Sequence, residues 1–163
     1  MSSMTGPQQL FGEFCASRPA PSAVLSPALR PALQYLVNAN ELQELREALA
    51  RGTLPPDFEA KLTRLAGGGL LHRSLVRHCR CFVALLLAVQ EGAFREANPV
   101  ECERLLRVLA YVRKDDDAIA DYKPGGFVDD QEEVRAATVE LAPLLKAFKA
   151  WRLRHQVPKM WVN

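Results

Sequence analysis

Apolar residues recur every three or four positions along most of the chain, the spacing that places side chains on one face of an α-helix. The strongest such pattern follows three consecutive glycines, Gly67 to Gly69, and runs from Leu70 to about Glu91. It is apolar over most of its circumference, which is typical of a helix in the middle of a bundle. No segment alternates apolar and polar residues for long, as a β-strand would. The sequence therefore predicts an all-α, single-domain bundle of six or seven helices with a central apolar helix.

We expect one face of this central helix to be buried and its first half to reach solvent. The predicted buried residues are Leu71, Leu75, Cys79, Phe82, Leu86 and Val89, with Leu85 and Leu87 widening the face. The predicted exposed residues are His72, Arg73, Arg77, His78 and Arg80. These bases could bind an anion such as phosphate, although a solvated helix end whose arginines neutralise nearby acids is the simpler interpretation.

Further helices are predicted on both sides of the central one. Shorter amphipathic patterns cover residues 7–15, 40–51 and 56–66, while four prolines prevent residues 18–31 from forming one regular helix. The clearest helix start is at Asn98, because Pro99 follows it and Glu101 stands three positions after it, as in a capping box.

The last predicted helix runs from about Asp130 to His155, and Pro143 should kink it. Its core-facing seam comprises Val134, Ala137, Leu141, Leu144, Leu145, Phe148 and Trp151.

Composition is that of an ordinary globular protein, with 163 residues, 48% hydrophobic residues and 25% charged residues. We expect one domain over residues 1–163, with N-terminal helices in 1–66 and a helical core in 70–163. The longest apolar run, Cys81 to Val89, is nine residues, whereas a membrane span takes ~20. The sequence also lacks the layout of a signal peptide. We therefore expect a soluble, cytoplasmic protein that is not an integral membrane protein.

Four cysteines (Cys15, Cys79, Cys81 and Cys102) are irregularly spaced and predict neither a disulfide framework nor a zinc site. Buried thiols acting as small hydrophobic side chains are the expected arrangement.

The most unusual stretch is acidic. Between Asp115 and Glu133 eight acidic residues stand against one base, Lys123, and they surround a Pro124-Gly125-Gly126 turn. From Arg135 onward there are six Lys and Arg residues and one acid. Charge is therefore segregated along a chain whose formal net charge is only +2, a value that gives no argument for a nucleic-acid partner.

The acidic stretch resembles the signature of the YkvA-like family, a widespread and mostly bacterial group of small helical proteins without an established activity. The matching pattern is Asp117-x-Ile119-x-Asp121-x-x-Pro124, then Gly125-Gly126, then the pair Asp129-Asp130. The resemblance covers at most residues 105–145, and Ala120 stands where the family usually has proline. It implies two helices joined by an acidic turn and implies little about function.

Clustered carboxylates could bind a divalent metal ion. Asp117 and Asp121 are four positions apart, so they share a face if that stretch is helical, and Asp129 and Asp130 could meet them across the turn. Four such oxygens suit Mg²⁺ or Ca²⁺. An EF-hand is excluded, because Ile119 would occupy the fifth position of its loop.

A purely structural role is the competing interpretation. Asp129 with Glu132, or Asp130 with Glu133, could form a capping box at the start of the last helix. Asp121 could also pair with an arginine, such as Arg113 or Arg77.

The C-terminal segment is basic and aromatic. Its residues of interest are Lys146, Lys149, Arg152, Arg154, His155, Lys159, Trp151 and Trp161. Such a segment could lie on an anionic membrane or bind single-stranded nucleic acid. A buried Trp151 with a solvated basic face is the preferred interpretation.

No phosphate-binding glycine loop, serine nucleophile motif or spaced Cys-His pair appears. We therefore expect a binding or scaffold module with a protein partner, with no catalytic residue and no required cofactor. Two alternatives remain: a metal-dependent hydrolase using Asp117, Asp121, Asp129 and Asp130, and a peripheral membrane or nucleic-acid binder acting through the basic C-terminal helix. The oligomeric state does not follow from the sequence.

Overall fold

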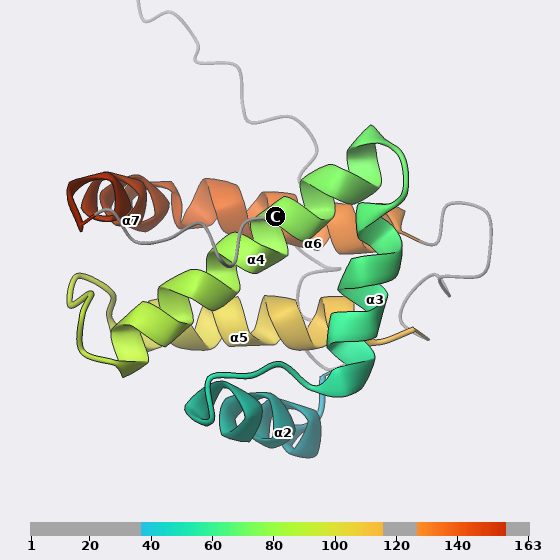
Figure 1. The fold of residues 1–163 in the computed structure, drawn as a ribbon, viewed down its shortest axis with the longest axis horizontal. Coiled ribbons are helices and arrows are strands. Elements are labelled where there is room, and N and C mark those ends of the chain that lie inside the picture. The colour runs from blue at the N-terminus through green and yellow to red at the C-terminus, as the bar shows by residue number, and fades with distance from the viewer. Residues whose placement is uncertain (1–36, 116–126, 156–163) are drawn as a thin grey trace, which may run out of the picture.

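The computed structural model describes residues 37–115 and 127–155, and this part of the chain contains six α-helices and no β-strand (Figure 1). The helices are α2 (Ala39–Ala50), α3 (Pro56–Ala66), α4 (Leu70–Gln90), α5 (Pro99–Arg113), α6 (Val128–Glu140) and α7 (Ala142–His155). The predictions for residues 7–15 and 18–31 lie outside the described residues. The predicted all-α, single-domain fold is confirmed.

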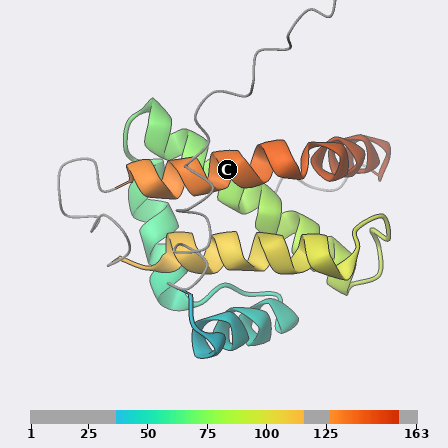
Figure 2. The ribbon, with the colours of Figure 1, turned by 180° about the vertical axis from the view of Figure 1, so that it is seen from behind.

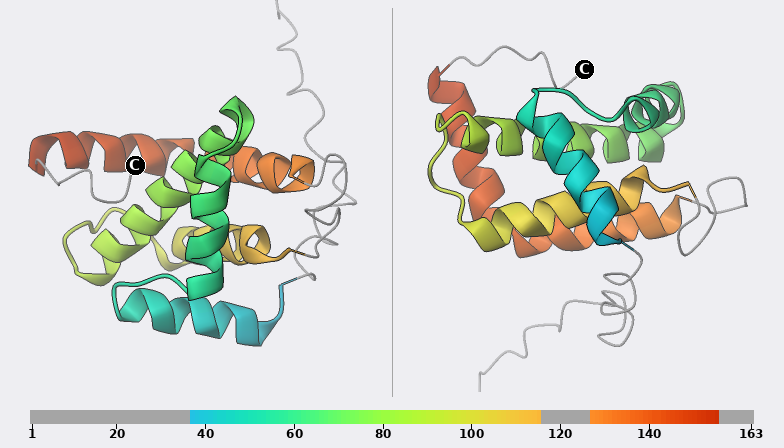
Figure 3. Two further views of the ribbon diagram at one scale, coloured as in Figure 1. Left: turned by 45° about the vertical axis from the view of Figure 1, so that its right-hand side comes forward. Right: turned by 90° about the horizontal axis from the view of Figure 1, so that it is seen from below.

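Helix α4 is central, as its apolar circumference predicts. It contacts α2, α3, α5 and α6. Seen from behind, α5 and α6 run side by side (Figure 2), and α2 lies across α4 and α5 (Figure 3). Phe82, Val83 and Leu85 of α4 have no exposed surface, so burial of their apolar area contributes a large share of the hydrophobic stabilisation. No helix within the described ranges is long and apolar enough to cross a membrane.

Two predictions about α4 are wrong. Leu71, expected in the core, leaves 68% of its surface exposed, because it lies at the edge of a groove between α4 and α6. Arg80, expected in solvent, is only 9% exposed. Its Nη1 donates a hydrogen bond to Oε2 of Glu59 on α3 at 2.7 Å. Helical periodicity identifies the apolar face of a helix, but the neighbouring helices decide how much of that face is covered.

The single kinked helix expected from Asp130 to His155 is two helices. Helix α6 ends at Glu140, Leu141 has φ −101° and ψ 19°, and α7 begins at Ala142. Pro143 is the second residue of α7. The reason is that proline has no N–H to donate and its ring clashes with the carbonyl four residues earlier, so α6 cannot continue through it.

The predicted seam of α6 and α7 is nevertheless confirmed. Val134, Ala137, Leu141, Leu144 and Phe148 are buried, and Leu145 and Trp151 pack against the core. At its end the Trp151 ring stacks on Phe148 with centroids 5.6 Å apart. Phe94 packs edge-on against Phe148 at 5.2 Å. Trp151 is half-buried against the core, so the preferred interpretation of a buried tryptophan is confirmed only in part.

Helix caps show where local signals succeed and fail. The capping box of Asn98 with Glu101 is present, with both hydrogen bonds at 2.9 Å. The predicted capping boxes of Asp129 and Asp130 are wrong, because the cap residue of α6 is Phe127 and no side chain makes a cap hydrogen bond there. Both aspartates are buried in the first turn and contact other helices instead.

Replacing Phe82 by alanine should lower the free energy of unfolding by about 3–5 kcal/mol, because it removes a fully buried aromatic ring from the central helix. Urea denaturation followed by circular dichroism would measure this. Leu153→Ala on α7 is the control: its side chain is 74% exposed, so the change should stay within about 0.5 kcal/mol. Equal losses in both variants would contradict the central position of α4.

Candidate functional site

Asp129 and Asp130, two of the four predicted metal ligands, are interior residues with protein partners. Asp129 is 8% exposed, and its Oδ2 accepts a hydrogen bond from the Tyr111 hydroxyl on α5 at 2.7 Å. Asp130 has no exposed surface, and its Oδ2 lies 3.4 Å from Nζ of Lys61 on α3. Asp117 and Asp121, the other two, lie outside the described residues.

Lys61 is the residue that joins the two ends of the acidic stretch. Its side chain is 2% exposed. Besides its ion pair with Asp130, Nζ donates a hydrogen bond to the carbonyl oxygen of Lys114 at 2.6 Å. The same Nζ lies 3.8 Å from Asp115 Oδ1 and 5.7 Å from the centre of the Phe127 ring. One buried ammonium group therefore contacts the chain just before and just after residues 116–126.

Sequence reasoning missed Lys61, although a signal was present. Lys61 stands on the apolar stripe of α3, three residues after Phe58 and one before Leu62, and all three are buried. A charged residue inside an otherwise apolar helical face needs an opposite charge or strong acceptors around it. Those acceptors come from α5 and α6, which no local pattern in α3 could identify.

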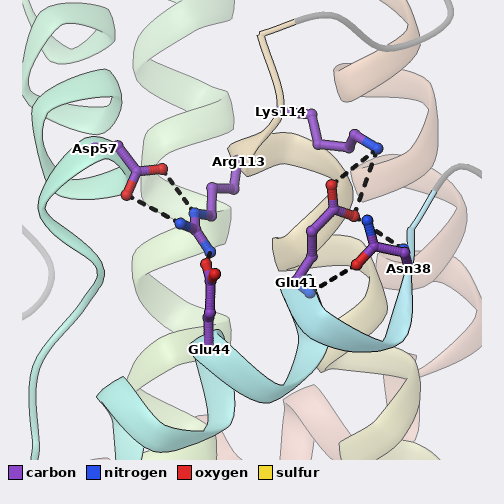
Figure 4. Close-up of polar contacts among 6 residues, drawn as sticks. All are labelled: Asn38, Glu41, Glu44, Asp57, Arg113 and Lys114. Carbon is purple, nitrogen blue, oxygen red and sulfur yellow. Dashed lines mark hydrogen bonds and ion pairs between the residues drawn. The ribbon is translucent and has the colours of Figure 1, made fainter.

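A second charge network lies at the end of α5, between this helix, α2 and α3 (Figure 4). Arg113 Nε donates to Asp57 Oδ2 on α3 at 2.7 Å, and Arg113 Nη1 lies 2.9 Å from Glu44 Oε2 on α2. Lys114 Nζ lies 3.1 Å from Glu41 Oε1. These contacts attach the end of α5 to α2 and α3. The suggested pairing of Asp121 with Arg113 lies outside the described residues.

The same residues line a depression of about 460 Å³, here called the acidic depression. Its lining residues are Glu41, Glu44, Asp57, Ala110, Arg113, Lys114 and Asp115. Four carboxylates thus face two bases. The carboxylates of Glu44, Asp57 and Asp115 remain more than half exposed, at 61%, 58% and 71%. The depression adjoins Asp115, where the acidic stretch begins.

The described cysteines are consistent with the expectation of buried thiols that act as small hydrophobic side chains. Cys79 is a free, buried thiol, and Cys81 and Cys102 are free and half-buried. Burial raises the pKa of the Cys79 thiol to about 12, and the negative charge of Asp130 adds to this. A thiol with such a pKa stays protonated at neutral pH and is not an activated nucleophile.

The metal hypothesis stays a prediction. In residues 37–115 and 127–155 no three His, Cys, Asp or Glu side chains are grouped so that they could hold a metal ion. Tyr111 and Lys61 contact Asp129 and Asp130, so any metal site would compete with those contacts. Asp117 and Asp121, on which the hypothesis also depends, are outside the described residues.

The basic C-terminal segment is described as far as His155. Helix α7 carries its bases without a single acidic residue, and Lys146 and Lys149 are exposed. Trp151 is occupied by its contacts with Phe94 and Phe148, while Lys159 and Trp161 lie outside the described residues. Binding to a membrane or to nucleic acid through this helix remains a prediction.

Comparison of the chain with protein-family models, with curated proteins and with solved structures finds no match. The resemblance to the YkvA-like family therefore stays a prediction, and the description of the site depends on the residues themselves.

Replacing Lys61 by methionine should lower the free energy of unfolding by about 3–5 kcal/mol, because the carboxylate of Asp130 would lose its buried counter-charge. Urea denaturation at pH 7 would measure the loss. Lys146→Met on the exposed face of α7 is the matched control and should change stability by less than about 0.5 kcal/mol. Adding Asp130→Asn to the Lys61 variant should recover part of the loss. A Lys61 variant as stable as the control would refute the buried ion pair.

Stability should also fall in acid through two ion-paired carboxylates. The Arg113 hydrogen bond holds the pKa of Asp57 below its usual 3.8, and the Arg80 hydrogen bond holds the pKa of Glu59 below 4.5. Their contribution is complete above these unfolded values and is lost as pH falls through the lowered folded values. Because the side chains of Asp57 and Glu59 are 58% and 44% exposed, solvent screens both ion pairs, and each should contribute only about 0.2–1 kcal/mol.

The measurement is the free energy of unfolding between about pH 7 and pH 3. The double variant Asp57→Asn with Glu59→Gln should show a shallower decline below about pH 5 than the native protein. Identical slopes would mean that neither ion pair stabilises the fold.

Proposed function

We propose that this protein is a helical binding module that docks a basic segment of a partner protein at the end of the bundle where α5 terminates. The observation that carries the proposal is the acidic depression, in which four carboxylates face two bases on a surface supplied by α2, α3 and α5. Asp116, Asp117 and Asp121 follow in the sequence directly after it. The sequence therefore continues to be acidic beyond the last described residue after α5.

Rigidity of the surrounding backbone supports this proposal. The end of α5 is held by Arg113 and Lys114 from the outside and by Lys61 from the inside. A surface whose backbone is already fixed loses little conformational entropy on binding, which favours affinity. An electrostatically complementary surface also raises the association rate with a basic partner.

The exposed carboxylates can accept further hydrogen bonds. Asp57 and Glu44 share the guanidinium of Arg113, yet more than half of each side chain is open to solvent. A lysine or arginine of a partner can therefore contact them without displacing Arg113. Asp115, which lies 3.7 Å from Nη2 of the exposed Arg64, is available in the same way.

A metal-dependent hydrolase using Asp117, Asp121, Asp129 and Asp130 remains the alternative proposal. The binding proposal is preferred because the described acids of the depression are accessible, whereas Asp129 and Asp130 are buried and in contact with Tyr111 and Lys61.

The binding proposal predicts measurable affinity for a basic probe, for which we choose a fluorescein-labelled peptide of alternating arginine and glycine. Fluorescence anisotropy at low salt should show binding that weakens as salt is raised. Replacing Glu44 by glutamine together with Asp115 by asparagine should weaken the dissociation constant about three- to tenfold, since two exposed carboxylates are removed.

The matched control removes the same charge at the other end of α5. Glu91→Gln with Glu96→Gln alters two exposed acids in the segment before α5 begins. This control should bind the peptide like the native protein. If both double variants lose affinity equally, the peptide responds to total charge alone and the proposed site is wrong.

A further inference from the structure

A separate surface, away from the acidic depression, has the features of a docking groove. Helices α4 and α6 border a groove of about 230 Å³, here called the α4–α6 groove. The buried side chains of Leu75 and Val134 form its floor, and Leu71 and Val139 stand at its edges.

The edges of this groove are unusually apolar. Leu71 on α4 is 68% exposed, and Val139 on α6 is 63% exposed. Single exposed apolar side chains are ordinary on a protein surface, but apolar residues gathered around one concavity are typical of an interaction site. Covering these two side chains would gain free energy from burial of apolar area.

Charge indicates the chemistry of the occupant. His78 and Arg135 line the groove and no acidic residue does, although Nη2 of Arg135 already lies 2.8 Å from Oε2 of Glu132 on the same helix. The adjoining first half of α4, from Leu70 to Arg80, carries five bases and no acid. Arg77 on this half, the residue before the groove-lining His78, makes no ion pair with any described residue. A partner with apolar anchors flanked by carboxylates would complement such a surface.

We propose that the α4–α6 groove binds one amphipathic α-helix of a partner protein, with apolar side chains in the groove and acidic side chains facing His78 and the neighbouring Arg77. A groove between two helices suits a third helix, whose anchors at spacings of three and four residues enter it side by side. Recognition of an extended strand would instead need a free sheet edge, and the described part of the chain has no strand.

A second copy of the chain fits this groove less well. The described helix richest in acids is α6, with Asp129, Asp130, Glu132, Glu133 and Glu140, and three of these five acids are buried. Its exposed apolar side chains, Val128 and Val139, are eleven positions apart, which is too far for anchors that enter the groove at spacings of three and four residues. Helix α7 does expose Leu153, but it is basic and would repel the arginines of α4.

The experiment uses a fluorescein-labelled synthetic peptide of 18 residues as its probe, with leucines at helical spacing and glutamates at the remaining positions. The full chain should bind this peptide, and the variant Leu71→Glu with Val139→Glu should bind it at least tenfold more weakly. Both substituted side chains are largely exposed, so circular dichroism should show an unchanged fold. Leu153→Glu, on a leucine that is 74% exposed on α7, is the matched control and should leave the affinity unchanged.

A second arm tests the charge preference. The same peptide with lysine in place of every glutamate should bind the native chain at least tenfold more weakly. In the variant Arg77→Glu the difference in affinity between the acidic and the basic peptide should become smaller. The groove variant should still bind the arginine-glycine peptide normally, and Glu44→Gln with Asp115→Asn should still bind the acidic peptide normally. These measurements distinguish a failure of the proposal for the α4–α6 groove from a failure of the proposal for the acidic depression.

Three results would overturn the proposal. One is equal binding of the acidic peptide to the native chain and to the groove variant. Another is equal affinity for the acidic and basic peptides. The third is a dimer of the native chain, detected by size-exclusion chromatography with light scattering, that becomes a monomer in the groove variant, since the groove would then be occupied by a second copy.

Discussion

The ammonium group of Lys61 sits inside the protein, and the arrangement of α3, α5 and α6 depends on how its charge is satisfied. Removing a charged amine from water is costly unless hydrogen bonds and an opposite charge replace the lost solvation. Here the Lys114 carbonyl oxygen at 2.6 Å and the Asp130 carboxylate at 3.4 Å supply both. Because these groups belong to different helices, the requirement of one side chain fixes how three helices meet.

This arrangement gives a physical reason for acids at the start of α6 that differs from helix capping. Asp129 and Asp130 occupy the first turn, where negative charge favours the helix dipole. Their side chains nevertheless point to Tyr111 and Lys61, and Glu133 one turn later pairs with Arg104 of α5. Asp129 and Asp130 therefore make tertiary contacts instead of the helix-capping hydrogen bonds that the local sequence predicts.

Features that depend on local chemistry could be predicted from the sequence. The central helix and the capping box of Asn98 follow from residues close together in the chain. The exposure of Leu71, the burial of Arg80 and the role of Lys61 depend on residues of other helices, about which helical periodicity carries no information. The acidic stretch begins at the acidic depression, but the exposed carboxylates of that depression come mainly from α2 and α3, far away in sequence.

Cys79 lies next to this interior charge pair, and its environment has a consequence for chemical reactivity. Its sulfur has no exposed surface, and its proton is held by burial and by the field of Asp130. An alkylating reagent can therefore react with Cys79 only after α4 separates from its neighbours, because this separation exposes the thiol and returns its pKa to the ordinary value. The rate of labelling at this one position consequently reports how often the centre of the bundle opens under native conditions.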